Sequence, residues 1–466
     1  MSTFSGLNTA YTGLSAARKG IDVVGQNIAN ANVAGYTRQR LNTSAAPSLA
    51  PMGRFSTGTG VGQGVSVDSI ARLGSLQLDT RVRSTAAVAG YSAVRANALI
   101  ALEDSFNEPG KNGLSTALQN FSAAWQGVAN KPGDNTAAAV LLSDTAAVAG
   151  QIADGYNNVR DQWNSTRSGL NDMVSELNDS ASQLATLNGA IRSTLASGAS
   201  ANELMDQRNS LATTIAALSG ATVRETPDGM VDVLIDGNAL VTGTNVRTLQ
   251  VTGGTSIDDT AAPTVSWTDR AGSAGISRGE IAGAVSLLAP AGAGGIFATA
   301  AASYNEVAAT LAATVNELHS QGATTGGATG LNFFTVGSPA ATTLKAIPTD
   351  ASGIATGTPG AGTLDGSMAD KISQLGSKAG SADAVWSTFV TATGALSRSE
   401  LQQATLAGVA SSSAVDLQLS NASVDLDEEN VNLLMYQHAY QGASRVMSAI
   451  DEMLDTLINR TGIVGR

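Results

Sequence analysis

The clearest apolar pattern lies near the C-terminus, where apolar residues alternate steps of three and four without interruption. This seam comprises Leu433, Tyr436, Tyr440, Ala443, Met447, Ile450, Leu454 and Leu457. A second repeat, with a spacing of seven and flanking aromatic residues, comprises Phe4, Leu7, Tyr11, Leu14, Ile21 and Ile28. Such spacing turns one apolar stripe of a helix toward a partner helix. The pattern predicts a helix at each end and leaves open whether each partner belongs to the same chain or to a neighbour.

Helix-end signals flank the C-terminal seam. Asp425 and Glu428 have the spacing of a capping box, and Asp427 and Glu429 add negative charge near the helix start. Gly462 supplies a stop signal at the other end. The sequence therefore predicts that the C-terminal helix begins after Asp425.

Between the two ends the periodicity changes several times. Residues 36–80 are expected to form loop and short strand. Helices are expected at 85–107, 112–130, about 135–218 with Asp134 as its N-cap, 301–319 and about 381–420. From residue 221 to about 280 the period switches to two, with turn sequences between the apolar runs, which predicts β structure. The stretch 320–370 is rich in Gly, Ala, Thr and Ser and is expected to be irregular.

This order predicts a mainly α fold with an inserted β-rich domain, in which the terminal helices pair as a coiled coil or helical bundle and the middle of the chain projects outward. The expected division places the two parts of a terminal coiled-coil domain at 1–60 and 425–466, two parts of a helical core domain at 61–220 and 301–424, and a β-rich outer domain at 221–300. Within the second core part, 320–380 is the irregular stretch.

Composition excludes several classes of function. Only 14% of the 466 residues are charged, the net charge is −12, and Lys and Arg form no cluster, which argues against nucleic acid and against an anionic membrane surface. No continuous apolar run is long enough for a membrane span, and residues 1–30 lack the pattern of a cleaved signal peptide. Because the chain has no cysteine, disulfides, zinc–thiolate sites and cysteine nucleophiles are excluded.

One catalytic motif has a match, because residues 275–279 (GISRG) fit the G-x-S-x-G elbow of serine hydrolases. The preceding residues do not read as a buried strand, so we interpret the segment as a turn and keep a secreted serine hydrolase only as a remote alternative. The two histidines, His319 and His438, lack clustered partners at metal-ligand spacing and are expected at a surface or interface. We expect no enzyme activity, no catalytic or metal site and no cofactor.

Both ends resemble a known family. Residues 7–14 (LNTAYTGL), 21–30 (IDVVGQNIAN) and 35–38 (GYTR) resemble the N-terminal signature of flagellar rod, hook and hook-associated axial proteins. Residues 424–429 (VDLDEE), 436–440 (YQHAY) and 455–459 (DTLIN) are similar to the C-terminal signature of that family. Interior segments resemble the branch that forms the first hook–filament junction, at 102–109, 130–134, 206–211, 315–319 and Phe333–Phe334. The stretch 335–380 is short, so an outer domain of longer relatives is reduced or missing.

The resemblance implies a structural subunit of the bacterial flagellum, exported by the flagellar type III system and assembled as a ring between hook and filament, outside the cell after a cytoplasmic stage. It implies as partners further copies of the chain, the hook protein, the second junction protein and an export chaperone on the C-terminal helix, with no nucleic acid and no membrane insertion. The alternatives are the hook protein itself or the second junction protein. The residues expected to mediate assembly are Leu7, Tyr11, Leu14, Ile21, Ile28, Leu433, Tyr436, Tyr440, Met447, Ile450, Leu454 and Leu457.

Overall fold

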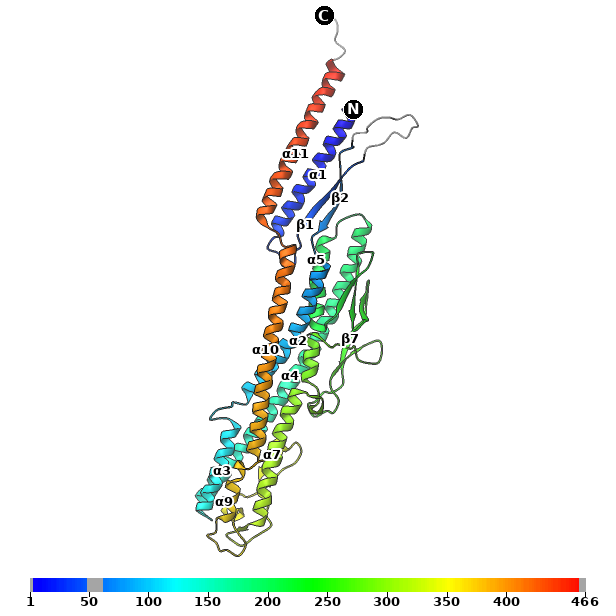
Figure 1. Cartoon of the computed structure of the whole chain (residues 1–466). Helices are drawn as coiled ribbons and strands as arrows, with labels where there is room; N and C mark the ends of the chain where they lie inside the picture. Colours follow the sequence, from blue (N-terminus) through cyan, green and yellow to red (C-terminus); the bar gives the residue numbers. More distant parts are fainter. Residues whose placement is uncertain (1–2, 48–61, 461–466) are drawn as a thin grey trace.

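The computed structural model describes residues 3–47 and 62–460 and shows a long rod with both ends of the chain at one end of it (Figure 1). There the helices α1 (Thr3–Asn30) and α11 (Leu426–Asp455) run side by side in opposite directions, and a short π-helical turn (Thr456–Arg460) extends α11. The strands β1 (Gln39–Ala45) and β2 (Val65–Arg72) form an antiparallel pair beside α1. The predicted pairing of the terminal helices is confirmed.

The body of the rod is a bundle of long helices. Its principal members are α2 (Leu76–Ser105), α4 (Asn135–Ala196), α7 (Ile296–Gln321) and α10 (Ala382–Ala422). The helix α10 packs along α2 and α7 and leads directly into α11, so it connects the body to the terminal pair. Shorter helices pack against this bundle, namely α3 (Leu114–Asn130), α5 (Asn202–Ser219) and α6 (Gly279–Leu287). Large buried side chains such as Trp163 and Trp386 fill its core.

Side-chain caps explain where two of these helices begin. Asp134 accepts hydrogen bonds from the backbone N–H groups of Thr136 (2.7 Å) and Ala137 (3.1 Å), which confirms it as the N-cap of α4. Ser75 caps α2 through a 3.4 Å bond from Leu78 N–H, so this helix begins at residue 76 rather than at the expected 85. The sequence did not indicate this N-terminus of α2, because the apolar periodicity of the helix is weak near its start.

The helix expected over 135–218 is wrong as a single element. The chain leaves the helix at 197–201 and re-enters it at Asn202, so α4 and α5 are separate. Gly198 has φ +78°, a left-handed conformation that ends helices and that glycine adopts without a Cβ clash. This break places the start of α5 next to the terminal pair, where Glu203 contacts Gln26 and Gln39.

The β structure lies on one side of α4. Strands β3 (Thr222–Glu225), β4 (Val231–Ile235), β5 (Asn238–Thr242) and β6 (Asn245–Val246) form an antiparallel sheet, and β7 (Leu249–Thr252) pairs with β8 (Thr264–Trp267). Asn188 on α4 is fully buried and binds both the N–H and the C=O of Val231, at 3.1 and 2.8 Å. Asn178, also on α4, holds Leu249 in the same way. Two asparagines of one helix thus hold the first residues of β4 and β7.

The far end of the rod is less irregular than expected. Between residues 320 and 380 the chain forms α8 (Ala340–Thr343), α9 (Ser367–Ser373), β9 (Ala323–Thr324), β10 (Phe334–Thr335), β11 (Lys345–Ala346) and β12 (Ala355–Gly357). Phe333 and Phe334 are buried there against Phe121 and Trp125 of α3. The composition suggested loop, but these two aromatic side chains give the segment a core of its own.

The structure confirms a mainly α fold with a β-containing insertion. Among the described residues, the helices α2 and α4 are long enough and have a high enough mean hydropathy for a membrane span. Neither contains a continuous apolar run of that length, so the sequence did not indicate them. Both pack along other helices of the body, and core helices of globular proteins share this property.

Candidate assembly interface

The terminal helices meet through a regular series of small and large residues. A Cβ atom at Gly6 would lie 3.2 Å from Ile450 Cδ1, and one at Gly13 would lie 3.9 Å from Ala443 Cβ. A Cβ atom at Gly20 would lie 2.5 Å from Cδ1 and Cε1 of Tyr436, well inside van der Waals contact. Each step of seven along α1 is thus matched by a step of seven backwards along α11, as an antiparallel heptad pairing requires.

The residues predicted to mediate assembly divide into two groups. Ile450 is buried, and eight others are half-buried in or beside the helix pair, namely Leu7, Leu14, Ile21, Ile28, Leu433, Tyr436, Met447 and Leu454. By contrast Tyr11 (61%), Tyr440 (38%) and Leu457 (53%) are exposed. The seams therefore contribute partly to contacts within the chain and partly to its outer surface.

Sequence reasoning missed the small residues of this contact. On α1 the residues closest to full burial are Ala10, Ala16, Ala17, Val23, Val24 and Asn27. The signal that could have found the contact is the repeat of Gly6, Gly13 and Gly20. Glycine destabilises a helix interior, so a regular repeat of it indicates that a close neighbour needs the space.

Outside this contact, α11 carries a second apolar stripe that nothing in the described chain covers. This outer stripe consists of Val431, Met435, Val446 and Met453, which are 66%, 53%, 51% and 51% exposed. Their spacings of 4, 11 and 7 place them on one side of the helix. The polar face of α11, which includes Gln437, Gln441 and Ser448, is separate from it. Exposed apolar stripes of this kind are typical of association surfaces.

Below the terminal pair, a buried carboxylate joins both ends of the chain. Glu429 at the start of α11 is 1% exposed and accepts hydrogen bonds from Arg38 Nε (2.8 Å) and Asn27 Nδ2 (3.1 Å). Asn27 Oδ1 in turn accepts from the Gln39 N–H and the Tyr36 hydroxyl, both at 2.9 Å. Burial, followed by the nearby carboxylates, raises the pKa of Tyr36 to about 12, so this hydroxyl remains a donor.

The predicted capping box at the start of α11 is only half formed. Asp425 caps the helix by accepting from the N–H groups of Asp427 (2.9 Å) and Glu428 (3.2 Å). The Glu428 side chain does not return to the cap and instead pairs with Arg38 Nη1 at 2.9 Å. That hydrogen bond and the positive charge lower the pKa of Glu428. Competition from the guanidinium explains the departure from the expected motif.

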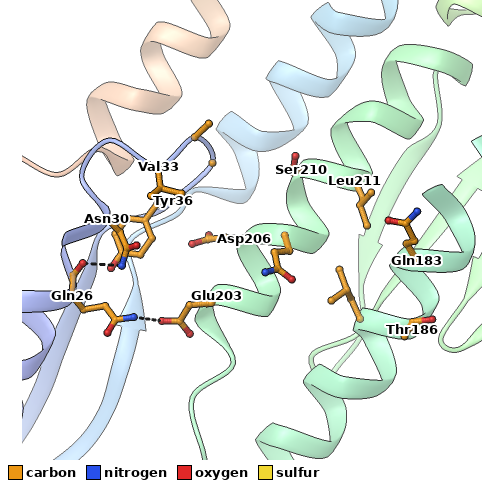
Figure 2. Close-up of a pocket in the computed structure, with 14 residues that line it drawn as sticks. Gln26, Asn30, Val33, Tyr36, Gln183, Thr186, Glu203, Asp206, Ser210 and Leu211 are labelled. Carbon is orange, nitrogen blue, oxygen red and sulfur yellow. Dashed lines mark hydrogen bonds between the residues drawn. The ribbon is translucent and has the colours of Figure 1, made fainter. Parts of the chain in front are cut away.

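The start of α5 holds the segment that follows α1. Asp206 accepts from the Thr37 N–H at 3.0 Å and from Arg72 Nε at 2.5 Å. Glu203 accepts from Gln39 Nε2 at 2.9 Å. It also accepts from Gln26 Nε2 at 3.2 Å (Figure 2). We call this set of polar contacts, together with those of Glu429, the joint.

A cleft of about 750 Å³ lies at the joint, between the end of α1 and the helices α4 and α5 (Figure 2). Polar side chains such as Gln183 and Gln207 line it beside the apolar Val33 and Leu211. The terminal pair is thus attached to the body through directional hydrogen bonds around a cleft rather than through a continuous apolar core.

The remaining candidate residues carry no catalytic arrangement. Residues 275–279 form a turn into α6, with Gly275 at φ +74° and Gly279 at φ +82°. The expectation of a surface or interface position is wrong for His319, which is fully buried, accepts from the Ala355 N–H at Nε2 (2.9 Å) and binds the Leu331 carbonyl through Nδ1 (2.7 Å). His438 is exposed, as expected. In residues 3–47 and 62–460 no group of three or more metal-binding side chains occurs.

Comparison with known proteins gives matches along most of the chain. Residues 99–334 match the family model of the flagellar hook-associated protein FlgK helical domain. Residues 7–37 match the flagella basal body rod protein model, and residues 418–460 match the C-terminal model of the flagellar basal body rod FlgEFG proteins. The two terminal matches cover most of the paired helices α1 and α11.

Individual relatives agree with these models. Flagellar hook-associated protein 1 of Bacillus subtilis is 28% identical over the whole of both chains. The proteins of that name from Escherichia coli and Salmonella typhimurium are 25% and 27% identical over 56% and 57% of this chain, which spans 47% of their length. A solved structure of the hook junction protein FlgK from Burkholderia pseudomallei is 23% identical, with a TM-score of 0.46, over 56% of this chain and 47% of that one. Since the helical-domain model alone accounts for residues 99–334, half of the chain, and rod-protein models match its two ends, the chain belongs to the flagellar hook-associated protein FlgK family.

Proposed function

We propose that copies of this chain assemble side by side as a ring between hook and filament, with α1 and α11 forming the wall of the tube. As a member of the FlgK family the chain is a structural component of the flagellum at the hook–filament junction. The finer arrangement rests chiefly on the outer stripe of α11, because an exposed apolar stripe beside a completed helix pair needs a further partner.

The two faces of α11 fit different surroundings in such a tube. The outer stripe, with Val446 and Met453, suits a neighbouring subunit because burial there removes apolar surface from water. The polar face, with Gln441 and Ser448, suits a water-filled channel. The body would then project outward and meet the hook protein on one side and the second junction protein on the other.

Export before assembly is part of the proposal. An uncovered outer stripe in the cytoplasm is an aggregation hazard, and a chaperone that binds an amphipathic helix in a groove would cover it. We infer that the chaperone of the flagellar type III system binds α11, after which the chain is exported and assembled outside the cell. A purified chain that lacks residues 425–466 should lose chaperone binding, whereas a chain that lacks residues 1–40 should keep it. The reverse pattern would show that the other end is recognised.

No catalytic role is included in the proposal. Residues 275–279 form a turn into α6, and both ring nitrogens of His319 are occupied by backbone groups. The relatives with known names are structural flagellar proteins.

Deletion of the gene tests the proposed function directly. The deletion strain should be non-motile, carry hooks without filaments in electron micrographs, and release unassembled filament subunits into the medium. Complementation with the wild-type chain should restore filaments. Normal filaments in the deletion strain would contradict the proposal.

A further inference from the structure

A small cavity below the joint is lined by three arginines, two of which, Arg83 and Arg208, form no direct ion pair with any described residue. It lies between α2, α5 and the β3–β4 sheet and has a volume of about 20 Å³. Its lining includes Arg72, Arg83 and Arg208 together with the carboxylates of Asp79 and Glu225. A volume of about 10–15 Å³ accommodates one water-sized particle, so the cavity can hold a single small ion or a water molecule but no phosphate or sulfate.

Arg83 is the least satisfied of these side chains. It is 6% exposed, and one terminal nitrogen, Nη2, donates to Asn209 Oδ1. Its Nε is buried and has no hydrogen-bond partner among the described residues. A buried guanidinium N–H without an acceptor is costly, because the group has lost its water and gained nothing in return.

Arg208 adds a second buried positive charge. It is 8% exposed, and its Nη1 donates to the Gly229 carbonyl at 2.6 Å. Burial is the main cause that lowers the pKa of Arg83 and of Arg208. The positive charge of Arg72 lowers both further, whereas Glu225 raises both and Asp79 also raises the pKa of Arg83. Three guanidinium groups and two carboxylates thus line the cavity, so its lining carries one excess positive charge.

The nearby carboxylates are engaged elsewhere. Asp206 pairs with Arg72 from outside the cavity at 2.5 Å. Asp79 accepts from Gln418 Nε2 at 2.5 Å and lies 4.0 Å from Arg72 Nη1. Glu225 is exposed on β3. Among the ion pairs of residues 3–47 and 62–460, none within 4.0 Å involves Arg83 or Arg208.

We propose that this cavity binds one small monovalent anion, chloride under ordinary salt conditions, with the unpartnered Nε of Arg83 as a principal donor. Such an ion would link α2, α5 and the adjacent sheet directly beneath the joint, where Arg72 and Asp206 hold the terminal pair. The inference does not depend on the proposed ring assembly.

Two measurements on the full-length chain test the site. The first follows the thermal unfolding midpoint while chloride replaces gluconate, which is too large for the cavity, at constant ionic strength. Because a ligand that binds only the folded state stabilises it, the midpoint should rise with chloride concentration. Arg83→Met should abolish this dependence, whereas Arg81→Met, on the exposed side of the same helix, should preserve it.

The second measurement uses only the wild-type chain, so it does not depend on whether a variant folds. Crystals grown in sodium bromide should show an anomalous difference peak in the cavity, within hydrogen-bond distance of Arg83 Nε. A cavity without a bromide peak, filled by water alone, would overturn the proposal. So would an equal chloride dependence in the wild type and in Arg83→Met.

Discussion

The ring of Tyr436 lies directly against the backbone of Gly20, so that a Cβ atom at residue 20 would come within 2.5 Å of the ring. This contact fixes the register of the two terminal helices, because sliding either helix by one residue would place a side chain where the ring now lies. The heptad pairs Gly6–Ile450 and Gly13–Ala443 repeat the same register. The ends of the chain are therefore matched to each other in one defined alignment.

The first prediction compares two glycines of α1. Gly20→Ala should destabilise the terminal pair by about 1–3 kcal/mol, the usual cost of overpacking, since the ring of Tyr436 must move. Gly25→Ala should instead stabilise α1 by about 0.5–1 kcal/mol, because nothing lies within 4 Å of its Cβ position. Hydrogen exchange of α1 amides measures both effects. Equal protection in the two variants would argue against the register described.

The second prediction concerns the inner side of α11. Ile450→Asp or Leu454→Asp should leave the body folded and soluble, yet prevent assembly, so that filament subunits leak into the medium. Truncation of a packed side chain alone costs about 2–5 kcal/mol, and a buried unpaired carboxylate adds to this. Ser448→Asp, on the polar face of the same helix, should be tolerated. Normal swimming of both core variants would show that the helix pair is not needed for assembly.

The third prediction concerns the joint. Arg38→Met leaves the Glu429 carboxylate buried without its cation and should cost about 3 kcal/mol, the lower end for a broken buried pair because Arg38 keeps some solvent contact. Adding Glu429→Gln to Arg38→Met should restore part of the lost free energy of unfolding, because the neutral glutamine amide can still accept a hydrogen bond from Asn27. Denaturant unfolding of the two single variants and the double variant measures the coupling. Additive losses would show that the two side chains are not coupled.

The fourth prediction concerns acid sensitivity of the far end of the rod. Burial lowers the pKa of His319 below its ordinary 6.5, so the unfolded chain binds the proton more readily than the folded one. The contribution of His319 to the free energy of unfolding is therefore fully present above pH 6.5 and decreases as the pH falls below that value. His319→Gln should flatten the decline between pH 6.5 and 5, whereas His438→Gln, at an exposed position, should leave it unchanged. With only two histidines in the chain, an unchanged profile in His319→Gln would refute this assignment.

The periodicity of the sequence was sufficient to predict the mainly α fold, because a long helix with a buried stripe, such as α4 with Leu170, Val174 and Leu177, leaves a clear repeat. Helix N-caps could be predicted where a single side chain forms the cap, as at Asp134 and Asp425. The break between α4 and α5 was missed because it depends on a short polar segment within an otherwise helical pattern.

The joint could not be predicted from spacing. Its members, such as Asn27, Arg38, Asp206 and Glu429, lie up to 402 residues apart in the chain and come together only through the antiparallel pairing. Single polar residues carry no periodic signal, so the sequence indicates their partners only after the fold is known. The cavity at Arg83 has the same origin, since its lining comes from α2, α5 and the sheet.

We expect the outer stripe of α11 to contact a neighbouring copy of the chain in the flagellum. A photo-crosslinking residue such as benzoylphenylalanine can be placed at Val446, which is exposed in the outer stripe, with Ser448 on the polar face as the matched control. Illumination of isolated flagella should give a covalent dimer of this chain from position 446 and little or none from position 448. No dimer from position 446, or equal yields from both positions, would contradict the account.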